Sequence, residues 1–250
     1  MKLLLTADLH FRIDWFRWLI EQAPRYDLVC IAGDLLDMFE VKSTKEQARE
    51  VGRLIRELAD IVPVAVCSGN HDNAGRLVSH DRASLYEWFI DLGAHSKITT
   101  DGSTQKLEKL IVTTIPYHCS KEQKSIWLDR GSTIRRQTGK PWIVLHHVPP
   151  KTTLSGSGEE SEAAEILAAY RPDYFVSGHD HAFPYTSGQS WSQILGETRL
   201  LVPGVLLKAS FPNHIKLDSE SGKSSWHTTS ETWIPEEGLY DYLVLKLAKD

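Results

Sequence analysis

The stretch Asp27-Leu-Val-Cys-Ile-Ala-Gly-Asp-Leu-Leu-Asp37 sets the expectation for the fold of this chain. Residues Asp27–Ala32 form a short apolar run, which is typical of a strand buried on both faces of a parallel sheet. Gly33–Asp37 then places two carboxylates directly after that strand. Ligands of open α/β sheets bind beyond the carboxyl ends of the strands. The stretch therefore predicts an α/β fold whose chemistry lies at one sheet edge.

Strand-like and helix-like patterns alternate outward from this stretch up to about residue 182. Further strands are expected over 2–7, 64–67, 109–115, 142–145 and 174–177. Helices are expected after a cap at Asp14, after the capping box of Ser43 and Glu46, and over 82–92, 121–136 and 163–170. Later strands are expected over 199–202, 214–217, 223–229 and 240–247. The pattern indicates an α/β body with a β-rich end.

Length and charge restrict the classes of function. The 250 residues suit one domain, and 28 Lys and Arg against 33 Asp and Glu give a net charge of −5. Indiscriminate binding to a nucleic acid backbone usually needs a basic surface, which this balance does not favour. The apolar runs are far shorter than a membrane span. We expect no membrane association.

Cysteine usage and the N-terminal residues suggest a compartment. Met1–Asp8 carries too few apolar residues before its first acid for a signal peptide. Cys30 and Cys67 lie in apolar strand-like runs, and with Cys119 they make an odd number without metal-ligand spacing. We therefore expect buried, reduced thiols and a cytoplasmic protein.

Polar side chains follow five of the predicted strands at the point where each ends. The motifs are Asp8-x-His10, Gly33-Asp34-x-x-Asp37, Gly69-Asn70-His71-Asp72, His146-His147-x-Pro-Pro150 and Gly178-His179-x-His181. Each motif alone is weak, since a single histidine is more often structural than a ligand. Their common placement at strand ends carries the weight. Five strands are thus expected to deliver Asp, Asn and His side chains to one edge.

The chemistry of these side chains points to metal ions. Oxygen and imidazole donors without thiolate suit Mn, Fe, Zn or Ni. The donors are too many for one ion but fit two ions that share a carboxylate. Two such ions about 3.5–4 Å apart form the clamp used for in-line attack at phosphorus.

The five motifs, present in order over residues 8–181, resemble those of the calcineurin-like metallophosphoesterase superfamily. The resemblance implies a four-layer α/β/β/α sandwich of two mixed β-sheets, with the metal site at the carboxyl ends of the strands. We expect one metallophosphoesterase domain over 1–250. Residues 1–181 would carry the motifs, and the β-rich residues 182–250 would complete the second sheet.

Roles follow from the resemblance residue by residue. It implies one metal held by Asp8, His10 and His181, a second held by Asn70, His147 and His179, and Asp34 bridging both. His71 would bind no metal but would hydrogen-bond the phosphate and protonate the leaving oxygen. Asp37 and Asp72 match positions whose side chains do not bind the metal but orient the histidine ligands. Manganese is the favoured metal, with Fe, Zn and Ni as alternatives.

For three residues, the sequence leaves open whether they act in the site or have only a packing or surface role. The motif spacing selects His147 over His146, which would face the substrate or pack, because adjacent residues leaving a strand point opposite ways. Arg12 follows a metal motif and would meet a phosphate oxygen or else lie solvated on the surface. Tyr117 follows the strand at 109–115 and is a weak candidate for the site edge.

The resemblance implies a hydrolase that cleaves phosphoric monoesters or diesters by attack of a metal-bridging hydroxide. A small nucleotide-like compound or phospho-metabolite is the expected substrate. One alternative is a nuclease of the same superfamily, which usually adds a cap and a basic groove. The other is a non-catalytic scaffold of the same fold, although such relatives typically lose ligands that this chain retains.

Overall fold

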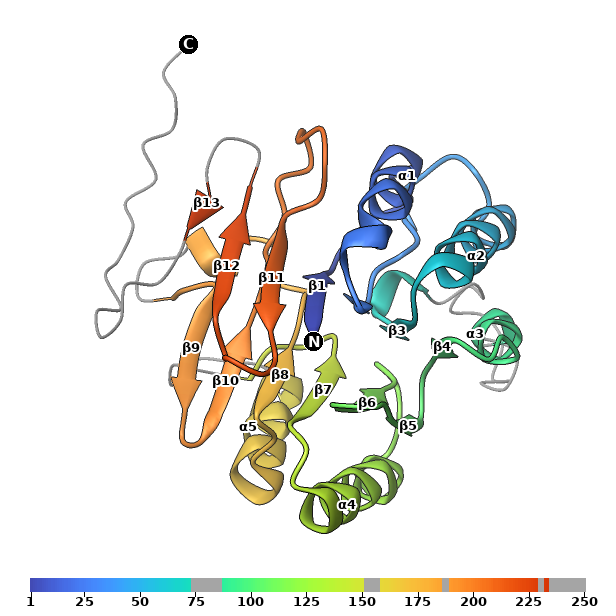
Figure 1. The fold of residues 1–250 in the computed structure, drawn as a ribbon. Coiled ribbons are helices and arrows are strands. Elements are labelled where there is room, and N and C mark those ends of the chain that lie inside the picture. The colour runs from blue at the N-terminus through green and yellow to red at the C-terminus, as the bar shows by residue number, and fades with distance from the viewer. Residues whose placement is uncertain (73–86, 151–157, 186–188, 229–231, 234–250) are drawn as a thin grey trace.

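The computed structural model describes residues 1–72, 87–150, 158–185, 189–228 and 232–233 (Figure 1). Two β-sheets lie face to face at the centre of this part of the chain, and helices cover their outer faces. Strands that follow one another in the first half of the sequence build the parallel part of the first sheet. Strands from the second half build most of the second.

The first sheet has the strand order β13-β12-β11-β1-β2-β3-β4. The strands are β1 (Lys2–Thr6), β2 (Leu28–Ala32), β3 (Val64–Cys67), β4 (Ile98–Thr99), β11 (His214–Asp218), β12 (Ser224–His227) and β13 (Thr232–Trp233). Strands β1 to β4 run parallel to one another, whereas β11 pairs with β1 antiparallel. The parallel half brings the carboxyl ends of β1, β2 and β3 to one edge.

The second sheet has the order β5-β6-β7-β8-β10-β9. Its strands are β5 (Ser103–Lys106), β6 (Ile111–Ile115), β7 (Trp142–His146), β8 (Tyr174–Val176), β9 (Ser192–Leu195) and β10 (Thr198–Leu201). The four inner strands are parallel, and β5 and β9 are antiparallel edge strands. Both sheets are therefore mixed, as the resemblance implies.

Helices close each outer face over a separate apolar core. The helices are α1 (Ile13–Gln22), α2 (Thr44–Ile61) and α3 (Glu87–Gly93) on the first sheet, and α4 (Lys121–Thr138) and α5 (Gly158–Tyr170) on the second. A third core lies between the two sheets. The result is the expected four-layer α/β/β/α sandwich. Within the described residues, no helix combines the length and apolar character needed to cross a bilayer.

The apolar run that opened the sequence analysis is continuous because β2 is covered on both faces. Leu28 and Cys30 point into the core between the sheets, while Val29 and Ile31 pack under the helices. Successive side chains of a strand face opposite ways, so a strand in the middle of this sandwich needs an apolar residue at every position.

The capping box at Ser43 and Glu46 is confirmed, since both reciprocal hydrogen bonds form at the start of α2. The predicted cap at Asp14 is wrong. Helix α1 begins at Ile13 with Arg12 as its N-cap residue, and the Asp14 carboxylate pairs with the Arg12 guanidinium at 2.9 Å. An acid in the first turn still interacts favourably with the helix dipole.

The β-rich end divides between the two sheets. Strands β9 and β10 complete the second sheet as expected, whereas β11 to β13 extend the first sheet beyond β1. The short strands β4, β5, β9 and β13 have no counterpart among the predicted elements. Of the predicted elements, the strand at 240–247 and the first residues of the helix at 82–92 fall outside the described residues.

Candidate metal centre

Backbone strain concentrates where the strands end. Asp8, His10, Asp34 and His179 have positive φ values of 55°, 41°, 52° and 68°. Residues other than glycine rarely adopt this left-handed conformation, and it persists only where the surrounding structure enforces it. These four residues belong to motifs that the sequence singled out, whereas Phe11 and Arg171, which also have positive φ, do not. The strain turns the polar side chains back over the sheet edge.

Three motif glycines let the strand ends approach one another. A Cβ atom on Gly33 would lie 2.3 Å from Nδ1 of His147, and one on Gly69 would lie 2.2 Å from Oδ1 of Asp34. At Gly178, a Cβ atom would lie 2.4 Å from Oδ2 of Asp8. Any side chain at these positions would displace a polar group of the centre, so glycine is required for this packing.

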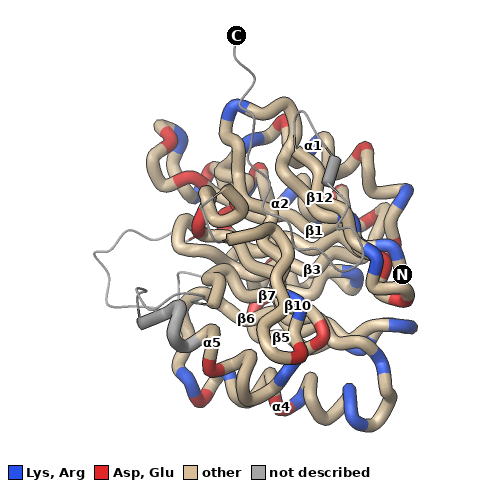
Figure 2. Tube along the Cα trace, turned by 90° about the vertical axis from the view of Figure 1, so that its left-hand side faces the viewer, with Lys and Arg blue, Asp and Glu red and all other residues tan. Residues whose placement is uncertain are grey.

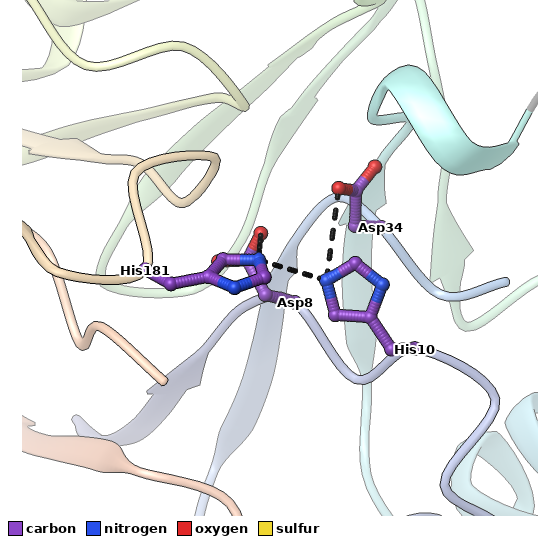
Figure 3. A group of neighbouring side chains, drawn as sticks. All are labelled: Asp8, His10, Asp34 and His181. Atoms are coloured by element: carbon purple, nitrogen blue, oxygen red, sulfur yellow. Dashed lines mark hydrogen bonds and ion pairs between the residues drawn. The ribbon is translucent and has the colours of Figure 1, made fainter. Parts of the chain in front are cut away.

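The first group of side chains comprises Asp8, His10, Asp34 and His181, whose donor atoms converge within 4.8 Å of one another (Figure 3). Nε2 of His10 lies 2.9 Å from Nε2 of His181 and 3.9 Å from Oδ2 of Asp34. Nε2 of His181 is 3.6 Å from Oδ1 of Asp8. Residues from the segment after β1, from the turn after β2 and from the segment after β8 thus meet at one point.

A second group lies on the other side of Asp34. Oδ1 of Asn70 is 3.0 Å from Nε2 of His147 and 2.8 Å from Nδ1 of His179. Nε2 of His147 is also 3.3 Å from Oδ2 of Asp34. The same carboxylate oxygen therefore lies near a nitrogen of each group, which is the geometry of a shared ligand.

The structure brings His147 rather than His146 into the cluster. Nδ1 of His147 donates a hydrogen bond to the carbonyl of Ala32 at 2.8 Å, so Nε2 is the ring nitrogen that faces Asp34 and Asn70. Nδ1 of His146 instead bonds to the Val148 carbonyl at 3.1 Å. The Ala32 carbonyl fixes the tautomer of His147, a function that sequence cannot reveal because every residue type carries that group.

Burial and neighbouring charges shift the pKa values of the clustered side chains in opposite directions. Burial raises the pKa of Asp8 to about 7. Burial also acts to raise the pKa of Asp34, but His147 outweighs it and holds that pKa below its usual value. Burial disfavours the charged form of His147 as well, yet Asp34 and Asp8 raise the pKa of His147 to about 9. Burial lowers the pKa of His10 to about 4.

These side chains fit divalent cations. Oδ2 of Asp8 is buried and has no hydrogen-bond partner in the structure, although buried carboxylate oxygens normally have one. The Nε2 atoms of His10 and His181 face each other at 2.9 Å, so both rings direct a possible ligand nitrogen to the same space. A cation there would satisfy the carboxylate oxygen and both imidazole nitrogens at once.

Comparison with known proteins agrees with this geometry. A family model described as calcineurin-like phosphoesterase matches residues 1–183. The chain belongs to the calcineurin-like phosphoesterase family. Among curated proteins, none shows significant sequence similarity to it.

Two solved structures are similar in fold to almost the whole length of this chain. The protein TT1561 of Thermus thermophilus is 15% identical, with a TM-score of 0.64 over 91% of this chain and 98% of its own. A dimetal phosphatase from Danio rerio is 11% identical, with a TM-score of 0.58 over 93% of this chain and 97% of its own. At these identities the likeness concerns the fold alone.

His71, from the Gly-Asn-His-Asp motif, lies beside the first group, and with His10 and Asp37 it forms a further set whose possible ligand atoms are within 4.8 Å of one another. Its ring centroid is 4.6 Å from that of His10, and its backbone N–H donates to Oδ1 of Asp34 at 2.8 Å. Nδ1 of His71 accepts the Met38 backbone N–H at 3.3 Å and lies 3.6 Å from Oδ1 of Asp37. Because Nδ1 accepts, the neutral ring carries its proton on Nε2.

The remaining candidates have other contacts. Oδ1 of Asp72 accepts the backbone N–H groups of Leu35 and Leu36, and Oδ2 accepts that of Gly69, all within 2.9 Å. The buried Asp72 thus joins two metal motifs. The Arg12 guanidinium bonds to Asp14 and to the carbonyls of Leu207 and Ala209. Its contacts anchor a loop and involve no member of the cluster.

Tyr117 reaches the site edge. Its ring centroid lies 5.8 Å from that of His147 and 6.2 Å from that of His179. The Tyr117 backbone N–H donates to Oγ of Ser68 at 3.1 Å, and the Ser68 N–H donates to Oδ1 of Asp101 at 2.8 Å. This link between the sheets holds the segment before Asn70. The sequence identified Tyr117 by its position after a strand, but nothing in the sequence indicated Asp101.

Proposed function

We propose that this protein hydrolyses phosphoric esters at a binuclear metal centre. Asp8, His10 and His181 would hold one ion, Asn70, His147 and His179 the other, and Asp34 would be shared. The observation that carries the proposal is the position of Asp34 Oδ2, 3.9 Å from Nε2 of His10 and 3.3 Å from Nε2 of His147. A carboxylate between two sets of donors suits a pair of ions better than one.

When bound, the two ions would neutralise phosphoryl oxygens and make water a stronger nucleophile near neutral pH. A side chain of the protein would protonate the leaving group. As the imidazolium, His71 would give its Nε2 proton to the departing oxygen and be left as the neutral imidazole. Asp37, 3.6 Å from Nδ1 of His71, would stabilise the imidazolium.

The proposal also extends to the class of substrate, the identity of the metal and the cellular compartment. Manganese is our choice among the metals that carboxylate, amide and imidazole ligands accept, with Fe, Zn and Ni as alternatives. Basic and acidic residues intermingle along the trace in Figure 2, and the net charge is −5. This distribution favours a small phosphate ester over a nucleic acid. We also treat residues 1–250 as one domain and the protein as cytoplasmic.

The first test compares two aryl substrates. We would measure hydrolysis of a bis-aryl phosphodiester and an aryl phosphomonoester by the metal-stripped protein, with and without added Mn²⁺. Asp34→Asn should lose at least about 100-fold in turnover, because a neutral amide cannot share its charge between two ions. Asp60→Asn, at an exposed carboxylate 3.4 Å from His95, is the matched control and should keep full activity. Turnover that survives in Asp34→Asn would overturn the binuclear proposal.

The proton-donor role of His71 has its own signature. His71→Ala should lose about 10²–10⁴-fold on esters with poor alkoxide leaving groups but much less on activated aryl esters. An aryl oxyanion leaves without a proton, whereas an alkoxide needs one. Metal content, measured by elemental analysis, should stay at the wild-type level. Equal losses on both ester types would contradict general-acid catalysis by His71.

A further inference from the structure

The loop between β2 and α2 exposes apolar side chains beside the candidate centre. Met38, Phe39 and Val41 are 47%, 81% and 99% exposed. They make up three of the eight large apolar side chains that stand exposed in the described part of the chain. A single exposed apolar residue needs no explanation, but three within four residues next to a reactive cluster suggest a surface that contacts a ligand.

This loop is held firmly from below, so the exposure of Phe39 is built into the fold. The buried side chain of Gln47 accepts the Asp37 backbone N–H at 2.9 Å and donates to the carbonyls of Asp37 and Lys42, both at 2.8 Å. Oδ1 of Asp37 accepts the Phe39 N–H at 2.9 Å. Gln47 thus fixes the loop at both ends, and Asp37 fixes the backbone of Phe39 itself.

The position of Phe39 relative to His71 indicates which part of a substrate it would meet. Their ring centroids are 5.4 Å apart with an interplanar angle of 75°, an edge-to-face contact. The neighbouring Met38 N–H donates to Nδ1 of His71. Under the proposed function, the departing group takes its proton from Nε2 of this same ring, so an extended leaving group would lie within reach of the Phe39 ring. Phe39 therefore offers an exposed apolar surface to the leaving group.

Resting on that proposed function, we infer that Phe39, with Met38 beside it, forms a stacking platform for the leaving group, and that the preferred substrates carry a planar ring there, as nucleoside phosphates do. A flat aromatic or nucleobase ring gains from stacking on an exposed phenyl ring, by an amount that a sugar or small alkyl group does not match. The contact is unspecific for base identity, since every base has a π-face.

A matched pair of substrates tests the platform. Adenosine monophosphate and ribose phosphate leave through the same type of alkoxide and differ only in the base; their methyl diesters form the equivalent pair for a diesterase. With Mn²⁺, the wild type should show about ten-fold higher kcat/KM on the nucleotide. Phe39→Ala should bring kcat/KM on the nucleotide down to the value on the ribose ester, and Phe39→Trp should retain the preference. Ile90→Ala, at an apolar position of α3 that is 69% exposed, should behave as wild type.

The outcomes separate this inference from the function on which it rests. Metal-dependent turnover of both pair members at equal rates, unaffected by Phe39→Ala, would overturn the platform and leave the phosphoesterase intact. A loss in Phe39→Ala that is equal on nucleotide and ribose ester would also overturn it, because such a loss reflects disturbance of His71. No metal-dependent turnover of these esters or of the aryl esters would overturn both proposals together.

Discussion

At the scale of single residues, Asp37 and Asp72 act on different parts of the site although both match supporting positions of the motifs. Asp72 is fully buried and accepts backbone N–H groups from the turns that carry Asp34 and Asn70. Asp37 is partly exposed and faces His71. Asp72 therefore stabilises the frame of the site, while Asp37 acts on a proposed proton donor.

We expect Asp72→Asn and Asp37→Asn to separate stability from activity. In Asp72→Asn the amide N–H₂ group would face the Gly69 N–H, so a buried donor loses its acceptor at a cost of about 1–3 kcal/mol. Asp37→Asn should change the free energy of unfolding by less than about 0.5 kcal/mol, since its carboxylate reaches solvent. Its activity on alkyl esters should fall. Urea unfolding and steady-state kinetics on both variants check this, and equal destabilisation would contradict it.

Two glycines give opposite predictions for the same substitution. Gly69→Ala should destabilise the protein by roughly 1–3 kcal/mol and abolish activity, because the new methyl would overlap the Asp34 side chain and its backbone nitrogen. Gly52→Ala should stabilise it by about 0.5–1 kcal/mol, since helix α2 gains a better helix former. At Gly52 the methyl would lie 3.5 Å from the Arg56 side chain, an ordinary contact. Thermal unfolding of both variants decides the signs.

At the scale of elements, helices and strands could be predicted where a pattern of neighbouring residues marks them. The capping box at Ser43 is a local pattern, and α2 begins where that pattern places it. The start of α1 differs because the Asp14 carboxylate is engaged by Arg12 rather than by the helix N–H groups. Strand β9 pairs with β10 across one turn and carries a mixed burial pattern, so no apolar alternation marks it.

The cross-strand histidine pair of β11 and β12 predicts an acid-sensitive element. His214 and His227 are register partners whose rings stack with centroids 4.8 Å apart. Burial lowers the pKa of His214 to about 3, and its Nδ1 bonds to the Pro212 carbonyl at 3.0 Å. The unfolded chain, with a histidine pKa near 6.5, binds the proton more readily. Stability from the neutral His214 is therefore full above that value and falls as the pH decreases toward 3.

We expect the His214 contribution to the free energy of unfolding to change by up to about 1.4 kcal/mol per pH unit between about pH 6 and pH 4. His214→Asn keeps a donor for the Pro212 carbonyl but cannot titrate, so it should flatten this slope. Urea unfolding at several pH values measures it. An unchanged slope in His214→Asn would assign the acid sensitivity to other groups.

At the scale of the whole molecule, the sequence predicted which side chains come together better than it predicted the arrangement of the two sheets. The motifs follow strand ends, and parallel strands bring those ends to one edge, so Asp8, Asn70 and His179 meet although they are far apart in the chain. The division of the β-rich end between two sheets depends on the pairing of β11 with β1, which spans nearly the whole sequence. Pairing between residues so far apart in the sequence has no local sequence pattern, so the partner of β11 could not be predicted.

Binding of metal should couple the two halves of the sandwich. Donors come from the segments after β1 and β2 of the first sheet and from those after β7 and β8 of the second, so a cation that binds only the folded state stabilises their common arrangement. At 100 times its dissociation constant, Mn²⁺ should add about 2.7 kcal/mol. For a chain of this size that corresponds to a rise in Tm of roughly 5–10 °C.

Scanning calorimetry of the metal-stripped protein with and without Mn²⁺ measures this rise in Tm. Asp34→Asn should lose most of it, because the residue lies between both groups of donors. Asp60→Asn, which removes an equal charge from a side chain that is 77% exposed, should keep it. The same rise in both variants would mean that Mn²⁺ acts through surface carboxylates. A rise confined to proteins with Asp34 intact would locate the stabilising ions at the shared carboxylate, where the two sheets meet.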